Sequence, residues 1–149
     1  MLFFLTACKD VLYEEKPLSP KTEYEFSGRA ELGTPLSGSH ISALKFRNLQ
    51  RGEKIGETLT HPDGTYQIKL STDYDGPVLL VVNGGTYRDL TTKDVVALKP
   101  GQELTSAITH IKMPETTNIN AWTTMAVARV VADRGFWIKA LRNSLKSRE

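Results

Sequence analysis

Histidine and acidic side chains are common metal ligands, and this chain has few of them at useful spacing. The three histidines, His40, His61 and His110, lie in separate segments, and none has a carboxylate or thiol at ligand spacing. A zinc site needs three or four convergent ligands. We therefore expect exposed histidines on strands or turns, and no metal site.

An acidic and aromatic segment, Asp73-Tyr74-Asp75-Gly76, is similar to the start of a calcium loop. Such a loop needs a bidentate carboxylate nine residues after Asp75, where this chain has Gly84. The spacing therefore favours a turn between two strands.

Aromatic residues could form a binding platform for a sugar, with Asp73 and Asp75 as hydrogen-bond partners. The four aromatic residues concerned are Tyr66, Tyr74, Tyr87 and Trp122. The predicted ligand-binding set consists of Asp73, Tyr74, Asp75 and Tyr87. The alternative is that aromatic residues at alternating strand positions belong to the core, and we expect Tyr66 to be buried there.

The sequence shows no catalytic or cofactor motif. Gly84-Gly85-Thr86 lacks the spacing and the following helix of a phosphate-binding loop, and neither a dinucleotide fingerprint nor a nucleophile elbow occurs. A catalytic triad does not require neighbours in sequence, so an enzyme stays as the third alternative. We expect no catalytic residues and no cofactor.

The single cysteine, Cys8, cannot form an internal disulfide, but its neighbours give it another role. Leu5-Thr6-Ala7-Cys8 resembles the lipobox of bacterial lipoproteins, in which the cysteine is lipidated and becomes the mature N-terminus. Residues 1–8 lack the basic start of a signal peptide, and their apolar part is short. Either the true start lies upstream, or Cys8 is an ordinary buried thiol.

The lipobox resemblance implies a membrane partner through a lipid anchor, in the bacterial cell envelope, at the outer membrane or cell surface. Residues 9–22 are predicted to be a polar tether, because Pro17 and Pro20 block regular structure and charged residues keep the segment in water. The chain has 149 residues, which suits one domain. Its net charge of +2 is too small to indicate a nucleic-acid partner.

Residues 23–113 have the pattern of short strands. Tyr24, Phe26, Gly28 and Ala30 alternate with polar residues, and Ser39 to Phe46 shifts phase near Leu44, which indicates a bulge or burial on both faces. The polar stretch Arg47 to Gly52 is expected to be a hairpin loop. His61-Pro62-Asp63-Gly64 is expected to join a second hairpin.

The apolar run Val78 to Val82 is typical of a central strand, and Val95 to Leu98 and Leu104 to Ile111 follow as further strands. About seven strands with turns every 8–12 residues predict a single, immunoglobulin-like β-sandwich.

Three segments of this region resemble the carboxypeptidase regulatory-like domain. They are Phe26 to Ala30, Thr34 to Ala43 and Thr60 to Ile68. The resemblance implies a transthyretin-like (prealbumin-like) sandwich, of a kind that recurs in bacterial envelope proteins. It implies no peptidase chemistry, because the family name is historical.

Residues 118–149 change to helical spacing. Asn118 or Asn120 could cap a helix from about Ala121 to Asp133, and Gly135 is expected to separate it from a second amphipathic segment. Four residues, Ala121, Met125, Ala128 and Ala132, form a stripe that could pack on another helix or a sheet. The second segment carries Trp137, Ile138, Leu141 and Leu145, with Lys139, Arg142, Lys146 and Arg148 on its other face.

The basic end of the chain has two interpretations. It could lie on anionic lipid headgroups, or it could be the solvated face of a packed helix. For the chain as a whole, the sequence predicts a non-catalytic envelope lipoprotein that serves for surface display or binds a protein or a glycan. The alternative is an accessory, carbohydrate-binding-like module of a larger envelope enzyme or transporter.

Overall fold

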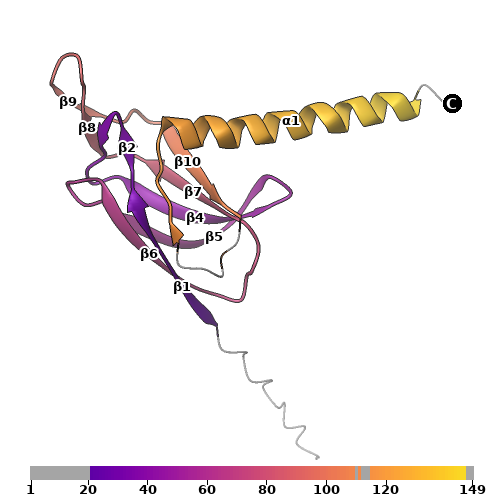
Figure 1. Ribbon diagram of the computed structural model, residues 1–149, viewed down its shortest axis with the longest axis horizontal. Helices are drawn as coiled ribbons and strands as arrows, with labels where there is room; N and C mark the ends of the chain where they lie inside the picture. Colours follow the sequence, from indigo (N-terminus) through magenta and orange to yellow (C-terminus); the bar gives the residue numbers. More distant parts are fainter. Residues whose placement is uncertain (1–20, 110, 112–114, 147–149) are drawn as a thin grey trace, which may run out of the picture.

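The computed structural model describes residues 21–109, 111 and 115–146, with Glu115 and residues 136–146 described by their backbone alone. It shows two packed β-sheets followed by one long helix (Figure 1). The predicted class, a mainly β sandwich with a C-terminal helical segment, is confirmed.

The smaller sheet has three strands in the order β11-β1-β6. β1 (Thr22–Arg29) pairs antiparallel with β6 (Thr65–Thr72) along its whole length, and parallel with the short β11 (Glu115–Thr116). A parallel bridge also joins Ala30 to Ile119. The sandwich therefore continues past residue 113, where the sequence predicted its end.

The larger sheet has four strands in the order β10-β7-β4-β5. They are β4 (His40–Arg47), β5 (Gln50–Leu59), β7 (Val78–Asn83) and β10 (Glu103–Ile108). The first five residues of β7 are buried, and the strand lies between β10 and β4, so the predicted central strand is confirmed.

The main core lies between the two sheets. It takes alternate residues of β1 and β6, such as Phe26, Ile68 and Leu70, and packs them against Ile41 and Leu80 of the larger sheet. Burial of these apolar side chains is the main favourable term for the sandwich, because each large one contributes about 1.5–3 kcal/mol.

The turn at Asp63-Gly64 forms, but it does not join a hairpin. Gly64 has φ +79°, and an added Cβ would lie 2.7 Å from the carbonyl oxygen of Ala30. β5 before the turn belongs to the larger sheet, whereas β6 after it pairs with β1. The predicted second hairpin is therefore wrong, because tertiary packing carries the chain from one sheet to the other at this turn.

The first hairpin is tighter than the sequence predicted. Arg47 pairs with Gln50, so the loop is only Asn48 and Leu49, with φ 53° and 59°. Positive φ at both positions is the geometry of a type I′ turn, which matches the twist of the strands. β5 consequently starts within the stretch predicted to be a loop. The predicted irregularity in β4 is confirmed as register shifts on both sides of Leu44.

Two short pairs complete the strands. β2 (Glu31–Leu32) pairs with β3 (Thr34–Pro35), and β8 (Thr86–Arg88) pairs with β9 (Val95–Ala97). The β8–β9 hairpin projects from one end of the sandwich (Figure 1).

The C-terminal region is one helix, α1 (Ala121–Lys146), and not two segments. Asn120 caps it, because its Oδ1 accepts a hydrogen bond from the Thr123 amide at 3.0 Å. Gly135 lies inside α1 and does not interrupt it. A glycine within a helix costs about 1 kcal/mol relative to alanine, which weakens a helix without necessarily ending it.

The face of α1 that meets the sheet also differs from the predicted stripe. Ala121, Met125, Ala128 and Ala132 are exposed, whereas Thr123, Thr124 and Val127 are partly buried. The contact is therefore made by two hydroxyls and one branched side chain, and the stripe of small residues lies outside it.

Candidate binding surface

The predicted lipid anchor and one histidine cannot be placed. Leu5, Thr6, Ala7 and Cys8 lie outside the described residues, as does His110. Within the described part of the chain, no group of three or more histidine, cysteine or acidic residues is placed to hold a metal ion. His40 is half-exposed on β4, with its Nε2 3.6 Å from Glu57, and His61 is exposed in the Asp63-Gly64 turn.

The predicted sugar platform does not form. Tyr74 is only 3% exposed and belongs to the core, where its hydroxyl donates to the Pro77 carbonyl at 2.7 Å. Arg47 Cζ lies 5.0 Å from the centroid of the Tyr74 ring, so the guanidinium group stacks on this ring. A buried ring cannot stack on a sugar, and Tyr74 is therefore removed from the predicted site.

The other candidates of that site come from different parts of the fold. Asp73 and Asp75 are exposed on either side of Tyr74, Tyr87 is half-buried on β8, and Trp122 is exposed on α1. Tyr66 is buried as expected, with its hydroxyl donating to the Thr117 carbonyl, and burial raises its pKa.

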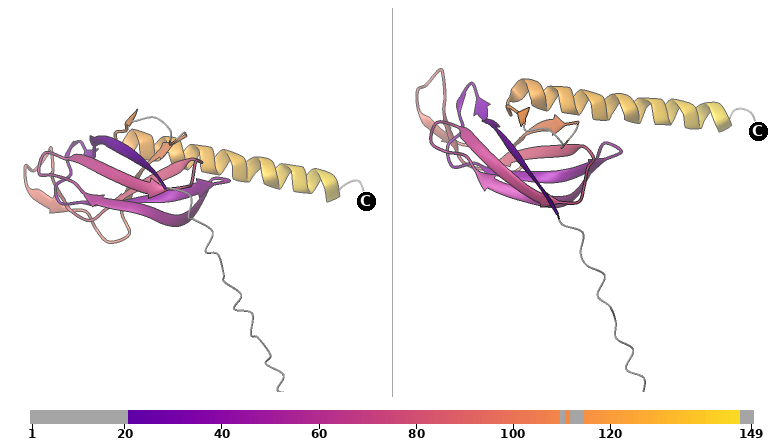
Figure 2. Two further views of the ribbon diagram at one scale, coloured as in Figure 1. Left: turned by 90° about the horizontal axis from the view of Figure 1, so that it is seen from below. Right: turned by 60° about the horizontal axis from the view of Figure 1, so that its bottom comes forward.

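A different surface is built where α1 crosses the outer face of the larger sheet. Phe46, Leu79 and Val81 form a small second core on this face, and Leu44, Leu49 and Val127 pack against them. Val127 is the member of this cluster contributed by α1, so the helix covers the sheet through few side chains. The views in Figure 2 show α1 lying along one side of the sandwich.

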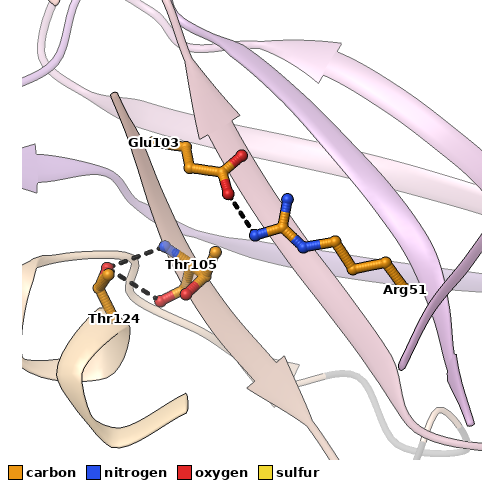
Figure 3. A network of polar contacts seen from close by, with 4 residues as sticks. All are labelled: Arg51, Glu103, Thr105 and Thr124. Carbon is orange, nitrogen blue, oxygen red and sulfur yellow. Dashed lines mark hydrogen bonds and ion pairs between the residues drawn. The ribbon is translucent and has the colours of Figure 1, made fainter. Parts of the chain in front are cut away.

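The start of α1 is fixed to the edge strand β10 by two threonines. The Thr105 amide donates to Thr124 Oγ1 at 2.8 Å (Figure 3). The Thr105 carbonyl accepts from Thr123 Oγ1, also at 2.8 Å. These are the outward backbone groups of an edge strand, which would otherwise be open to another chain. The helix therefore both attaches to this edge and protects it.

Apolar grooves follow both sides of α1. One has a volume of about 440 Å³, and its lining includes Pro77, Ile108, Ala126, Val130 and Arg134. The other has a volume of about 460 Å³, and its lining includes Leu79, Glu103, Ala128 and Val131. Volumes in this range are typical of ligand-binding clefts.

The charges at the two grooves differ. In the second groove Arg51 pairs with Glu103, and this hydrogen bond raises the pKa of the arginine (Figure 3). That groove is therefore close to neutral. In the first groove Arg134 is the charged lining residue, and no acidic side chain of the described residues pairs with it.

Large apolar side chains of α1 remain exposed, and two of them, Val130 and Val131, line the grooves. Trp122 is 76% exposed, Met125 and Val130 are each 53% exposed, and Val131 is 41% exposed. They lie on several sides of the helix, among exposed charged residues such as Arg129 and Asp133. The geometry therefore provides an exposed apolar surface beside the two grooves.

Sequence reasoning missed this surface. Two signals were present: the Thr123-Thr124 pair after the capping Asn120, and the phase shift near Leu44 that indicated burial on both faces of β4. Neither signal predicts which element covers the outer face of β4, because α1 and Phe46 come together only in the folded chain.

Comparisons with known proteins add little to this description. No protein-family model matches the chain, and no curated protein matches it. A solved structure with partial similarity is a 9R-lipoxygenase from Cyanothece PCC8801, with 13% sequence identity and a TM-score of 0.38. The match covers 66% of this chain but only 16% of the lipoxygenase chain, and at this TM-score it carries no argument.

The fold and surface thus define a class of protein, a mainly β sandwich with one C-terminal helix that flanks apolar grooves. In the described part of the chain, no helix has the length and apolar character needed to cross a membrane.

Proposed function

We propose that this chain is a non-catalytic, lipid-anchored protein of the bacterial cell envelope that binds a partner protein through the grooves of α1. The sequence Leu5-Thr6-Ala7-Cys8 supports the anchor, and the polar segment 9–22 supports a tether between the anchor and the sandwich. We also propose membership of the carboxypeptidase regulatory-like family, on the three sequence segments that resemble it.

The binding function is proposed because the sandwich covers α1 only in part. The apolar side chains Val130 and Val131 border the two grooves and are half-exposed, next to the buried outer-face cluster of Phe46, Leu79 and Val81. Contiguous exposed apolar surface beside clefts is typical of protein interaction sites. A partner helix would fill such grooves with side chains three and four residues apart.

The same surface fits the alternative, an accessory module of a larger envelope enzyme or transporter. In that case the grooves would receive a neighbouring domain and not a separate protein. The two arrangements use the same contacts and differ in whether the partner is covalently joined.

Metabolic labelling with a fatty-acid analogue tests the anchor. The wild-type protein should incorporate the label and sediment with membranes, and Cys8→Ser should do neither. Equal labelling of the two proteins would show that Cys8 is not the lipidated residue.

Cross-linking in intact cells tests the binding surface. A photoreactive residue at Leu49, which lines both grooves, should give one discrete heavier adduct, and Val130→Arg should abolish it by filling the first groove with charge. The control Leu90→Arg changes another exposed apolar residue, on the β8–β9 hairpin, and should leave the adduct intact. An adduct that survives Val130→Arg would contradict binding in the groove.

A further inference from the structure

The end of β7 carries a chemically labile pair of residues. Of the five asparagines in the chain, Asn83 alone precedes a glycine. The backbone nitrogen of the following residue can attack the side-chain carbonyl of an asparagine, and glycine hinders this approach least because it has no Cβ. Asparagine is among the thermolabile residue types for this kind of reason. Packing and hydrogen bonds then decide whether such a pair reacts in the folded chain.

The fold leaves Asn83 and Gly84 open to this reaction. Asn83 is the last residue of β7, and both residues are exposed. A Cβ added at Gly84 would meet nothing within 4 Å. Among the residues that the structure describes, none forms a hydrogen bond with the Asn83 side chain or with the Gly84 amide. The attacking nitrogen and the group that it attacks are therefore both accessible.

The Asp63-Gly64 turn has a similar sequence and shows the protected arrangement. The Gly64 amide donates to the His61 carbonyl at 2.9 Å, and Asp63 Oδ1 accepts from the Thr65 amide at 3.0 Å. Gly64 is also buried. Both reacting groups are thus engaged in this turn, unlike those at the end of β7.

We propose that Asn83 is a site of spontaneous deamidation through a succinimide. The Gly84 nitrogen forms a bond to Asn83 Cγ, and the Cγ–Nδ2 bond breaks. The side-chain nitrogen leaves as ammonia and takes the proton of the Gly84 amide. Water then opens the ring at one of its two carbonyls, which gives either aspartate or isoaspartate, in which the main chain runs through the side-chain carbonyl.

The reaction places a new carboxylate beside Glu103. Asn83 is in register with His40 of β4 and with Glu103 of β10, and directly paired residues of antiparallel strands share a face of the sheet. Glu103 pairs with Arg51 and lines the second groove. Like charges that lie directly opposite are destabilising. Deamidation therefore changes the charge next to this groove and weakens the pairing of β7 with β10.

Peptide mapping by mass spectrometry tests the proposal, after incubation of the full, folded chain at mildly alkaline pH. The peptide that contains Asn83 should gain about 1 Da, as an amide becomes an acid, and should separate into aspartate and isoaspartate forms. Asn48 is an internal control, because it is exposed but precedes Leu49, and its peptide should keep its mass. Equal gains at both asparagines, or aspartate without isoaspartate, would overturn the succinimide route.

Two alanine variants test whether the Gly84 nitrogen is the attacking group. Gly84→Ala should slow the loss of Asn83 by at least about tenfold, because the added Cβ hinders the approach. Gly101→Ala is the matched control, since Gly101 also has positive φ, at +83°, and no neighbour within 4 Å of an added Cβ. It introduces the same backbone strain and should leave the rate at Asn83 unchanged. Equal rates in the two variants would contradict attack by the Gly84 nitrogen.

Comparison with the urea-unfolded chain tests the role of the fold. Asn83 should react in the folded chain within about threefold of its unfolded rate, whereas isoaspartate at Asp63 should form in urea alone, where its turn is opened. Circular dichroism should confirm that the incubated chain stays folded. If Asn83 reacts in urea but keeps its amide in the folded chain, the fold protects it and the proposal is wrong.

Discussion

Single hydroxyl groups decide how α1 meets the sandwich. Thr124 Oγ1 accepts from the Thr105 amide and donates to the Asn120 carbonyl, each at 2.8 Å, so one side chain joins strand, cap and helix. Thr123 makes the matching contacts to the Thr105 and Asn120 carbonyls. A valine at either position would keep the shape of the side chain and lose the hydrogen bonds.

Thr124→Val should therefore lower the free energy of unfolding by about 1–3 kcal/mol, because the partly buried Thr105 amide is left without its partner. Denaturant unfolding measures the change. Thr91→Val, at an exposed loop position, should change stability by less than about 0.5 kcal/mol. Similar values for both variants would show that the threonine contact does not hold the helix.

Some individual residues could be placed from the sequence. Tyr66 in the core and Gly64 in its turn follow from local chemistry, and the structure confirms them. Of the two predicted caps, Asn118 and Asn120, the structure selects Asn120. Tyr74 could not be placed in this way. Its ring lies beneath Arg47 of β4, which is far away in the sequence.

Among the helices and strands, α1 differs most from its prediction, because it is one continuous helix instead of two segments. It runs through Gly135 for 26 residues, although its contact with the sandwich lies near its beginning. An added Cβ at Gly135 would meet no neighbouring atom. The glycine is therefore not needed for packing, and it only lowers the intrinsic stability of the helix.

Gly135→Ala should increase the helix content seen by far-ultraviolet circular dichroism and stabilise α1 by about 0.5–1 kcal/mol. Gly84→Ala is the control, because Gly84 has φ +62° and an alanine there would be strained. That variant should lower the melting temperature. An unchanged or reduced helix content in Gly135→Ala would show that the helix is interrupted at this residue.

For the strands, the local sequence pattern predicts where each strand lies in the chain, but not which strands pair. Their existence followed from alternation and turn residues, and β7 followed from its continuous apolar run. Their pairing did not follow, since the same Asp-Gly turn is compatible with a hairpin or with a crossing between sheets. Packing of the core favours the crossing of the chain from one sheet to the other, because β6 then places Tyr66, Ile68 and Leu70 opposite the larger sheet.

At the scale of the whole molecule, exposed carboxyl groups couple stability to pH. Hydrogen bonds from Lys45 and Lys54 lower the pKa values of Glu53 and Glu57. Hydrogen bonds from Thr65 lower the pKa of Asp63, and the Thr92 and Thr91 amides lower that of Asp89. Each group binds protons more weakly in the folded chain than in the unfolded chain.

The part of the stability that these four carboxylates contribute should therefore persist from neutral pH down to about pH 5 and decline below about pH 4. A lowered folded-state pKa contributes stability above the unfolded pKa, and this contribution disappears as the pH falls through the folded value. Urea midpoints measured against pH test this, and the double variant Asp63→Asn, Asp89→Asn should show a shallower fall. A fall as steep as that of the wild-type chain would exclude these two groups as its cause.

The sequence by itself determined the class of fold, most of the strands, the helix start and the lipobox-like motif, because alternation, turns and caps are local in the chain. Only the tertiary structure decided which strands share a sheet, that Tyr74 is buried, and that α1 covers Phe46 and leaves grooves beside it. These features depend on contacts between residues far apart in sequence. Local spacing carries no information about which distant surface will exclude water from a given side chain.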